Sequence, residues 1–195
     1  MLASHSQIHS HPEPHLITPL HYLGYYAKVD AAPYDHINAA EAMREFTQEL
    51  PQGEEDYLDA LRSYASTLYG RVLEPTGCSF FLDKTPAYGL ILPFLSKLYP
   101  RAKYVVLTRH PLAVNHSVAH SFFGGDHAQA QRFNPIVKQY VPAIASFLRD
   151  KSVPYVHVRY EDVVSDPKEQ MSKILDHLGL EFEEITVNYG EASHI

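Results

Sequence analysis

The chain has 195 residues, the usual size of one domain, so we expect a single domain over residues 1–195. Its apolar content of 45% is sufficient for a globular core, and its formal net charge of -7 excludes a general attraction to nucleic acid or anionic lipid. Any anion-binding site must therefore be local and made by few residues. The one cysteine, Cys78, excludes an internal disulfide.

The first part of the chain, residues 1–36, is rich in His, Pro and Tyr. Three prolines between positions 12 and 19 remove backbone hydrogen-bond donors, so we expect irregular chain here with one short turn of helix. The segment lacks the basic and then apolar pattern of a secretory signal, and the longest apolar runs of the chain are too short to span a membrane. A cytoplasmic protein without membrane contacts is therefore expected.

Histidines and tyrosines in this segment each allow two interpretations. Histidines spaced by two and four residues can ligate zinc, but proline-rich chain rarely holds a rigid tetrahedral site, so we favour a flexible end over a metal site. Tyr22, Tyr25 and Tyr26 either line an aromatic acceptor pocket or simply pack, and packing is the preferred interpretation. The histidines concerned are His5, His9, His11 and His15.

Apolar periodicity predicts two helices in the next part of the chain, over residues 37–49 and 54–72. The segment "SFFLDKTP" has the composition of a short strand ending at Pro86, and we expect a buried helix over residues 88–98. The clearest strand is "AKYVVLTRHP", whose continuous apolar run is typical of a parallel sheet covered on both faces.

The rest of the chain continues this alternation. A helix is expected over residues 112–122, a polar loop in "GGDHAQAQRFNP", and a helix over 136–149 with a kink at Pro142. A second clear strand lies in "VPYVHVRYED". The last helix is predicted from Asp166 as its N-cap with a proline directly after it, and Gly179 ends it.

The order of these elements predicts an α/β fold, in which a parallel sheet is flanked by helices. Ligands of such sheets bind at the carboxyl ends of the strands. Lys84, Arg109 and Tyr160 each follow an apolar strand by a residue or two, so we expect all three at one edge of the sheet.

An anion site that suits a phosphate is predicted around Arg109. Its guanidinium offers a planar fork of donors that matches a phosphate, and the following helix adds free backbone N–H groups. Ser117, within that helix, can add a hydroxyl donor. The alternative is that Arg109 pairs with Asp162 or another carboxylate while Ser117 only packs.

Two further residues carry the charges that group transfer needs. Lys84 can neutralise charge that develops on a transferred group, unless it is a solvated lysine held by Asp83. Glu13 lies between two prolines and can act as a general base, although most glutamates are simply surface residues.

Two segments taken together resemble a known family. "FLDKTPAYGLILPFLSKLYPRAKYVVLTRHPLAVNHS" and "VRYEDVVSDPKEQMSKILDHLGL" resemble sulfotransferases that use 3′-phosphoadenosine-5′-phosphosulfate (PAPS), in the branch of bacterial and tyrosylprotein-type enzymes. The resemblance covers most of the chain from about Glu13 to Leu180. It implies the P-loop-NTPase-like sulfotransferase fold and transfer of a sulfuryl group to a hydroxyl or amine, without a metal.

The resemblance also implies roles for single residues. Arg109 and Ser117 match the residues that bind the 3′-phosphate of PAPS, and Tyr160 matches the tyrosine that lies against its adenine. Lys84 matches the lysine that contacts the sulfuryl group, and Glu13 is the best match to the catalytic base. The expected acceptor is a small molecule or a peptide.

The chain departs from the family pattern at its beginning. No glycine-rich loop of the type "PRSGTT", which cradles the 5′-phosphosulfate, occurs in the sequence, and we expect the first, central strand of the sheet to be missing with it. The alternative function is therefore an inactive nucleotide-binding or protein-interaction remnant of the same fold, which can pair through its open sheet edge as a homodimer.

Overall fold

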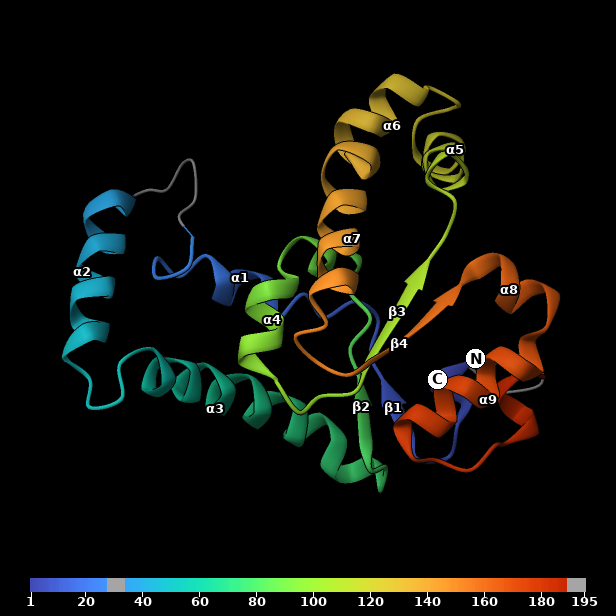
Figure 1. Ribbon diagram of the computed structural model, residues 1–195, viewed down its shortest axis with the longest axis horizontal. Helices are drawn as coiled ribbons and strands as arrows, with labels where there is room; N and C mark the ends of the chain where they lie inside the picture. The colour runs from blue at the N-terminus through green and yellow to red at the C-terminus, as the bar shows by residue number, and fades with distance from the viewer. Residues whose placement is uncertain (28–33, 189–195) are drawn as a thin grey trace. The chain divides into compact units, whose positions relative to one another are not determined.

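The computed structural model describes residues 1–27 and 34–188, and Figure 1 labels their helices and strands. The chain divides into two compact units. The N-terminal unit is Ser6–Pro100, and the C-terminal unit joins Met1–His5 to Arg101–Ile195. The single domain expected over residues 1–195 therefore stays a prediction, and each unit is described by itself.

The N-terminal unit contains a pair of strands and four α-helices in its described part. β1 and β2 are parallel, with Ile8 opposite Phe80 and Ser10 opposite Leu82. The elements are β1 (Ile8–Ser10), α1 (Ile17–His21), α2 (His36–Glu49), α3 (Glu54–Leu73), β2 (Phe80–Leu82) and α4 (Leu92–Leu98), with 3-10 turns at Glu74–Thr76 and Pro86–Leu90.

The expectation of irregular chain over residues 1–36 was wrong at β1, while α1 agrees with the short turn of helix expected in this segment. β1 is three residues long, and its hydrogen-bonding partner lies some seventy positions away at β2, so no local pattern predicts it. Residues 28–33 of this stretch lie outside the described part of the chain.

The two helices predicted from periodicity are confirmed as α2 and α3, each within a residue at either end. The side chain of Asp35 begins α2 by accepting a hydrogen bond from the Asn38 amide at 3.0 Å. The helix predicted over residues 88–98 is instead the 3-10 turn Pro86–Leu90 followed by α4. Pro93 lies in the first turn of α4, where a missing N–H costs nothing.

The core of the N-terminal unit lies along the apolar face of α3. Leu58, Leu61 and Ala65 recur at helical spacing and are buried together with residues of α1 and α4. Tyr25 and Tyr26 pack against this core, as their preferred interpretation predicted, while Tyr22 keeps 38% of its surface exposed.

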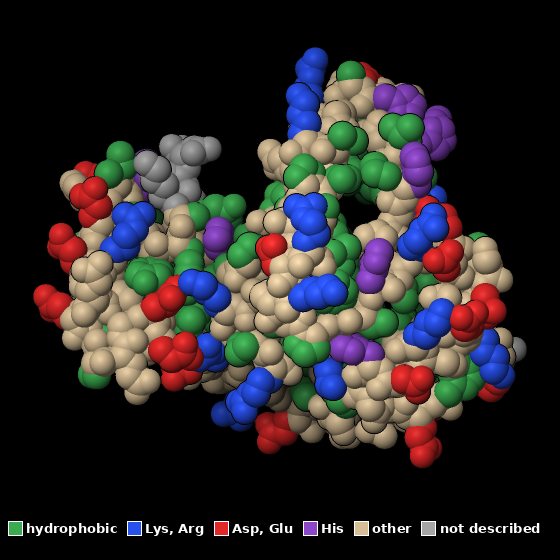
Figure 2. Space-filling model, in the orientation of Figure 1, with side chains coloured by type: hydrophobic (Ala, Val, Ile, Leu, Met, Phe, Trp, Pro, Cys, Tyr) green, Lys and Arg blue, Asp and Glu red, His purple; other side chains and the backbone are tan. Residues whose placement is uncertain are grey.

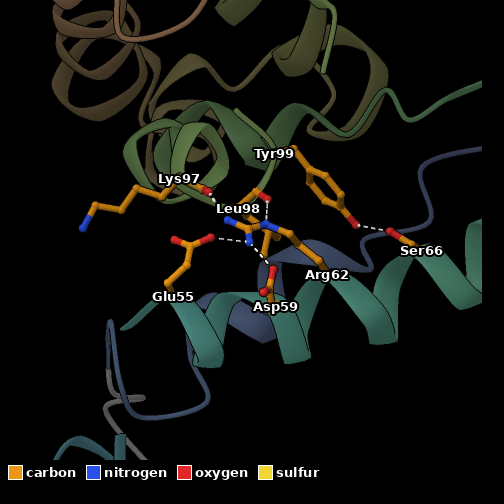
Figure 3. A network of polar contacts seen from close by, with 7 residues as sticks. All are labelled: Glu55, Asp59, Arg62, Ser66, Lys97, Leu98 and Tyr99. Atoms are coloured by element: carbon orange, nitrogen blue, oxygen red, sulfur yellow. Dashed lines mark hydrogen bonds and ion pairs between the residues drawn. The ribbon is translucent and has the colours of Figure 1, made fainter. Parts of the chain in front are cut away.

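Arg62 of α3 holds the C-terminal end of α4 in place (Figure 3). Its Nε donates to the Leu98 carbonyl at 2.6 Å and its Nη2 to the Lys97 carbonyl at 3.0 Å. Glu55 and Asp59, on the same helix, bind the other side of the guanidinium. The last carbonyls of a helix lack partners within it, so this arginine satisfies two of them and ties α4 to α3.

The C-terminal unit contains the other parallel pair, β3 and β4. Tyr104 lies opposite Tyr155 and Thr108 opposite Arg159. The elements are β3 (Tyr104–Thr108), α5 (Pro111–Phe122), α6 (His127–Phe133), α7 (Val141–Asp150), β4 (Tyr155–Arg159), α8 (Tyr160–Ser165) and α9 (Pro167–Leu178), with a π-helical turn at Ile136–Tyr140 and 3-10 turns at Leu2–Ser4 and Glu184–Thr186.

Two expectations for this unit were wrong. The polar loop expected in "GGDHAQAQRFNP" contains α6, because the Asp126 side chain accepts hydrogen bonds from the amides of Ala128 and Gln129 and so begins a helix. Pro142 does not kink a helix over 136–149. It lies in the first turn of α7, directly after the π-helical turn.

The last helix is confirmed in detail as α9. Asp166 accepts a hydrogen bond from the Glu169 amide at 3.0 Å, and Gly179 ends the helix with a φ of 77°, a left-handed value that suits glycine. Met171, Ile174, Leu175 and Leu178 form the buried face of α9.

The α/β class with parallel strands is confirmed. The described strands form two separate pairs, β1–β2 and β3–β4, and no strand of residues 1–27 or 34–188 joins them by hydrogen bonds. The covering expected on both faces of β3 was wrong at Leu107, which is 56% exposed. No helix in the described ranges combines the length and the apolar character needed to cross a bilayer.

Candidate functional site

The ends of β1 and β2 bring Glu13 and Lys84 together. The two strands are parallel and in register, so the residues that follow each of them leave the sheet at the same edge. Glu13 comes three residues after β1 and Lys84 two residues after β2. The Lys84 ammonium donates a hydrogen bond to Glu13 Oε1, and both side chains remain exposed. The sequence predicted Lys84, Arg109 and Tyr160 at one edge of a single sheet and did not predict this partner. In the described chain Lys84 instead follows a strand of the β1–β2 pair, whereas Arg109 and Tyr160 follow the strands of the β3–β4 pair.

The backbone at Glu13 is unusual. Its φ is 24°, and His15, two residues on, has a φ of 51°. Residues other than glycine rarely adopt such values, and strain of this kind concentrates at functional sites. Nε2 of His15 lies 3.8 Å from Glu13 Oε2, so the carboxylate has a basic side chain near each of its oxygens.

Asp83, beside Lys84, is held by hydroxyl groups. Tyr69 and Tyr88 donate to its Oδ2 and Thr85 donates to its Oδ1. Burial raises the pKa of Tyr88 to about 12 and raises the pKa of Tyr69 as well, so both phenols stay protonated donors at neutral pH. The alternative that Asp83 holds Lys84 was wrong, because Lys84 bonds to Glu13 instead.

The Asp83 network also reaches α1. The Tyr88 hydroxyl accepts a hydrogen bond from the Ile17 amide at 3.1 Å, which links the loop carrying Glu13 to the loop carrying Lys84. Sequence reasoning missed Tyr69 and Tyr88 as supports of the site. Tyr69 is fourteen positions from Asp83 on a different element, and no spacing rule connects them.

In the C-terminal unit, Arg109 and Tyr160 are neighbours. Each directly follows its strand, and Thr108 lies opposite Arg159 in the ladder, so the next residue of each strand meets the other. The Arg109 guanidinium lies 4.4 Å from the centre of the Tyr160 ring. Both side chains are exposed, and the stacked arrangement leaves the donor fork of the arginine open to an anion.

The alternative of an ion pair between Arg109 and Asp162 was wrong for the described chain, where Arg109 makes no ion pair. A different carboxylate, Glu161 in the first turn of α8, accepts a hydrogen bond at 2.9 Å from the amide of His110, the residue that precedes α5. This bond lowers the pKa of the Glu161 carboxyl. The sequence signal that could have found Glu161 is its place directly after Tyr160.

Ser117 lies exposed on α5. In the part of the chain that the structure describes, Ser117 makes no hydrogen bond to Arg109 or Tyr160. The five predicted site residues are thus brought together as two pairs, Glu13 with Lys84 and Arg109 with Tyr160, one in each unit. The roles predicted for all five stay predictions.

Comparisons with known proteins agree on one family for this chain. The model of the sulfotransferase family matches residues 1–184. Nodulation protein NoeE of Sinorhizobium fredii (strain NBRC 101917 / NGR234) is 27% identical over 200 residues, which cover 92% of this chain and 46% of NoeE. The chain therefore spans less than half the length of this relative.

Two solved structures have a similar fold. The sulfotransferase domain from the curacin biosynthetic pathway matches with a TM-score of 0.57 and 22% identity, over 95% of this chain and 69% of that one. The sulfotransferase domain from the Synechococcus PCC 7002 olefin synthase matches with a TM-score of 0.57 and 25% identity, over 96% of this chain and 69% of that one.

Proposed function

The chain belongs to the sulfotransferase family, and on this premise we propose that it transfers a sulfuryl group from PAPS to a hydroxyl or amine acceptor. The observation that carries the proposal is the Glu13–Lys84 pair at the ends of β1 and β2. A carboxylate and an ammonium in contact are the two groups that such a transfer needs: one removes a proton and the other balances negative charge.

Glu13 is the proposed general base. Its carboxylate takes the proton of the acceptor O–H or N–H while the acceptor atom forms a bond to sulfur. The bond from sulfur to the phosphate oxygen breaks, and adenosine 3′,5′-bisphosphate leaves with that electron pair. The left-handed backbone at Glu13 supports a fixed position for this carboxylate, which proton transfer requires.

Lys84 is proposed to bind the oxygens of the sulfuryl group. In the absence of substrate its ammonium bonds to Glu13, so donor binding exchanges that contact for one with the sulfuryl oxygens. Asp83 and its three hydroxyl donors support the strand end that carries Lys84. Developing negative charge is then met by a cation that is already in place.

Arg109 and Tyr160 are proposed to bind the nucleotide end of PAPS, with Ser117 adding a hydroxyl to the 3′-phosphate. The guanidinium fork of Arg109 matches a phosphate, and the Tyr160 ring offers an exposed aromatic face for adenine.

We also propose a small-molecule or peptide acceptor and a cytoplasmic location.

The test is the release of adenosine 3′,5′-bisphosphate from PAPS by the purified chain in the presence of a panel of hydroxyl and amine acceptors. Wild type is compared with Glu13→Gln and Lys84→Ala, and with Glu45→Gln and Lys138→Ala as matched exposed controls. Acceptor-dependent release that both site variants lose and both controls keep supports the proposal. Binding of the bisphosphate without release by wild type would instead favour the inactive nucleotide-binding module.

A further inference from the structure

Three histidines of the C-terminal unit gather at the junction of α5 and α6. His116 and His120 are four residues apart on α5, so they lie one helical turn apart on the same face. His127 is the first residue of α6. All three side chains are exposed, and Figure 2 shows histidines grouped on the surface over these two helices.

The turn between the helices brings His127 back to α5. Gly124 and Gly125 have φ values of 56° and 93°, which side chains rarely allow, and the Gly125 amide donates to the Ala119 carbonyl at 2.9 Å. Asp126 then begins α6 with its side chain. The cluster is therefore built by a hydrogen-bonded glycine turn and a capped helix start, rather than by a loose loop.

The imidazole rings lie close to one another. Ring centroids are 4.2 Å apart for His116 and His120, 5.5 Å for His116 and His127, and 6.1 Å for His120 and His127. One ring nitrogen from each histidine lies within 4.8 Å of the others. Over residues 1–27 and 34–188 this is the one group of three or more His, Cys, Asp or Glu side chains with such a spacing.

We propose that His116, His120 and His127 form a binding site for a divalent transition-metal ion, and the donor set points to Zn²⁺. Three neutral imidazoles with no carboxylate suit zinc, copper or nickel and disfavour magnesium and calcium. Zinc binds imidazole nitrogens at about 2.0–2.1 Å, and the three rings are exposed, so they can rotate toward a shared ion. A water molecule completes the four-coordinate site.

The three histidines are not among the five residues proposed for sulfuryl transfer, although His116 directly precedes Ser117 on α5. A metal bound here joins two turns of α5 to the first residue of α6 and so stabilises the turn between them. The proposed site is also distinct from the histidines of the N-terminal segment. His9 belongs to β1, whereas His11 and His15 are exposed and belong to no group of metal-binding geometry among the described residues.

Isothermal titration calorimetry of Zn²⁺ into the full chain, freed of metal by a chelator, tests the proposal. One Zn²⁺ per chain is expected. His116→Asn, His120→Asn and His127→Asn should each weaken binding by more than about 100-fold, the upper end of the loss caused by removing even an outer-shell partner. The matched control is the double variant His11→Asn with His15→Asn, which should bind as wild type does.

Far-ultraviolet circular dichroism of each variant establishes that it is folded, and these exposed positions tolerate the change. Cobalt(II) provides a second readout, because a tetrahedral nitrogen site gives intense visible absorption bands that wild type and the control should show and the three variants should lack. Saturable binding lost in the control but kept in the three variants would overturn the proposal, as would the absence of saturable binding in wild type.

Discussion

Lys84 donates a hydrogen bond to the carboxylate of Glu13, a residue 71 positions earlier in the chain. The contact exists because β1 and β2 are parallel and paired in register, so both loops leave the sheet at one edge. The site of the proposed chemistry is thus a consequence of strand pairing.

Breaking the Glu13–Lys84 pair should hardly change stability. Both side chains are exposed, and exposed ion pairs contribute about 0–1 kcal/mol. Glu13→Gln should therefore unfold in urea within about 1 kcal/mol of wild type, while lowering turnover about 100-fold or more, the usual effect of losing a general base. A large loss of stability would mean that the pair is structural.

Replacing Asp83, in contrast to replacing Glu13, should clearly reduce the stability of the fold. Its carboxylate accepts hydrogen bonds from Tyr69, Tyr88 and Thr85, and bonds to a charged group contribute about 1.5–3 kcal/mol each before non-additivity. Asp83→Ala should lower the free energy of unfolding by about 3 kcal/mol, measured by urea denaturation. Asp176→Ala, an exposed aspartate on α9, is the control and should cost less than about 0.5 kcal/mol.

The Arg109 side chain should contribute strongly to the affinity of the chain for the nucleotide. Arg109→Ala removes the donor fork and should weaken binding of adenosine 3′,5′-bisphosphate by about 10- to 150-fold, the equivalent of one charged hydrogen-bonding group. Arg109→Lys keeps the charge but loses the fork and the stack on Tyr160, so it should restore only part of the affinity. Calorimetry measures both, with the exposed Arg101→Ala as the control. Equal affinity in wild type and Arg109→Ala would contradict the assignment.

Lowering the pH should reduce the folding stability of the N-terminal unit through protonation of His21. Burial lowers its pKa, and its Nδ1 has no hydrogen-bond partner in the described structure. The unfolded chain, with a His pKa of about 6.5, then binds more protons than the folded chain, so stability is complete above that pH and falls as the pH drops toward the lower folded pKa.

The variant His21→Phe tests this pH dependence, because phenylalanine can keep the ring contacts with Tyr26 and Phe94 without a titrating group. Thermal unfolding of both proteins is measured between neutral and mildly acidic pH. The decrease in stability should be smaller in His21→Phe than in wild type. The same decrease in both proteins would assign the pH dependence to other groups.

Several elements could be predicted because their determinants are local. α2, α3 and α9 follow from apolar spacing within one segment, and the start of α9 follows from Asp166 and the proline after it. α6 was missed, although its Asp126 cap lies in the sequence, because a polar helix of seven residues has no marked apolar face. β1 was missed because three residues form a strand only when a partner is present.

For the candidate site, local sequence patterns were sufficient to predict which residues follow the strands: Lys84, Arg109 and Tyr160. Apolar runs and the polar residues that end them are local properties of the chain. The partners of these residues depend on tertiary contacts, which bring Glu13 to Lys84 and the Arg109 guanidinium to the Tyr160 ring. Strand register sets such contacts, and it depends on hydrogen bonds between segments far apart in sequence, which no local pattern specifies.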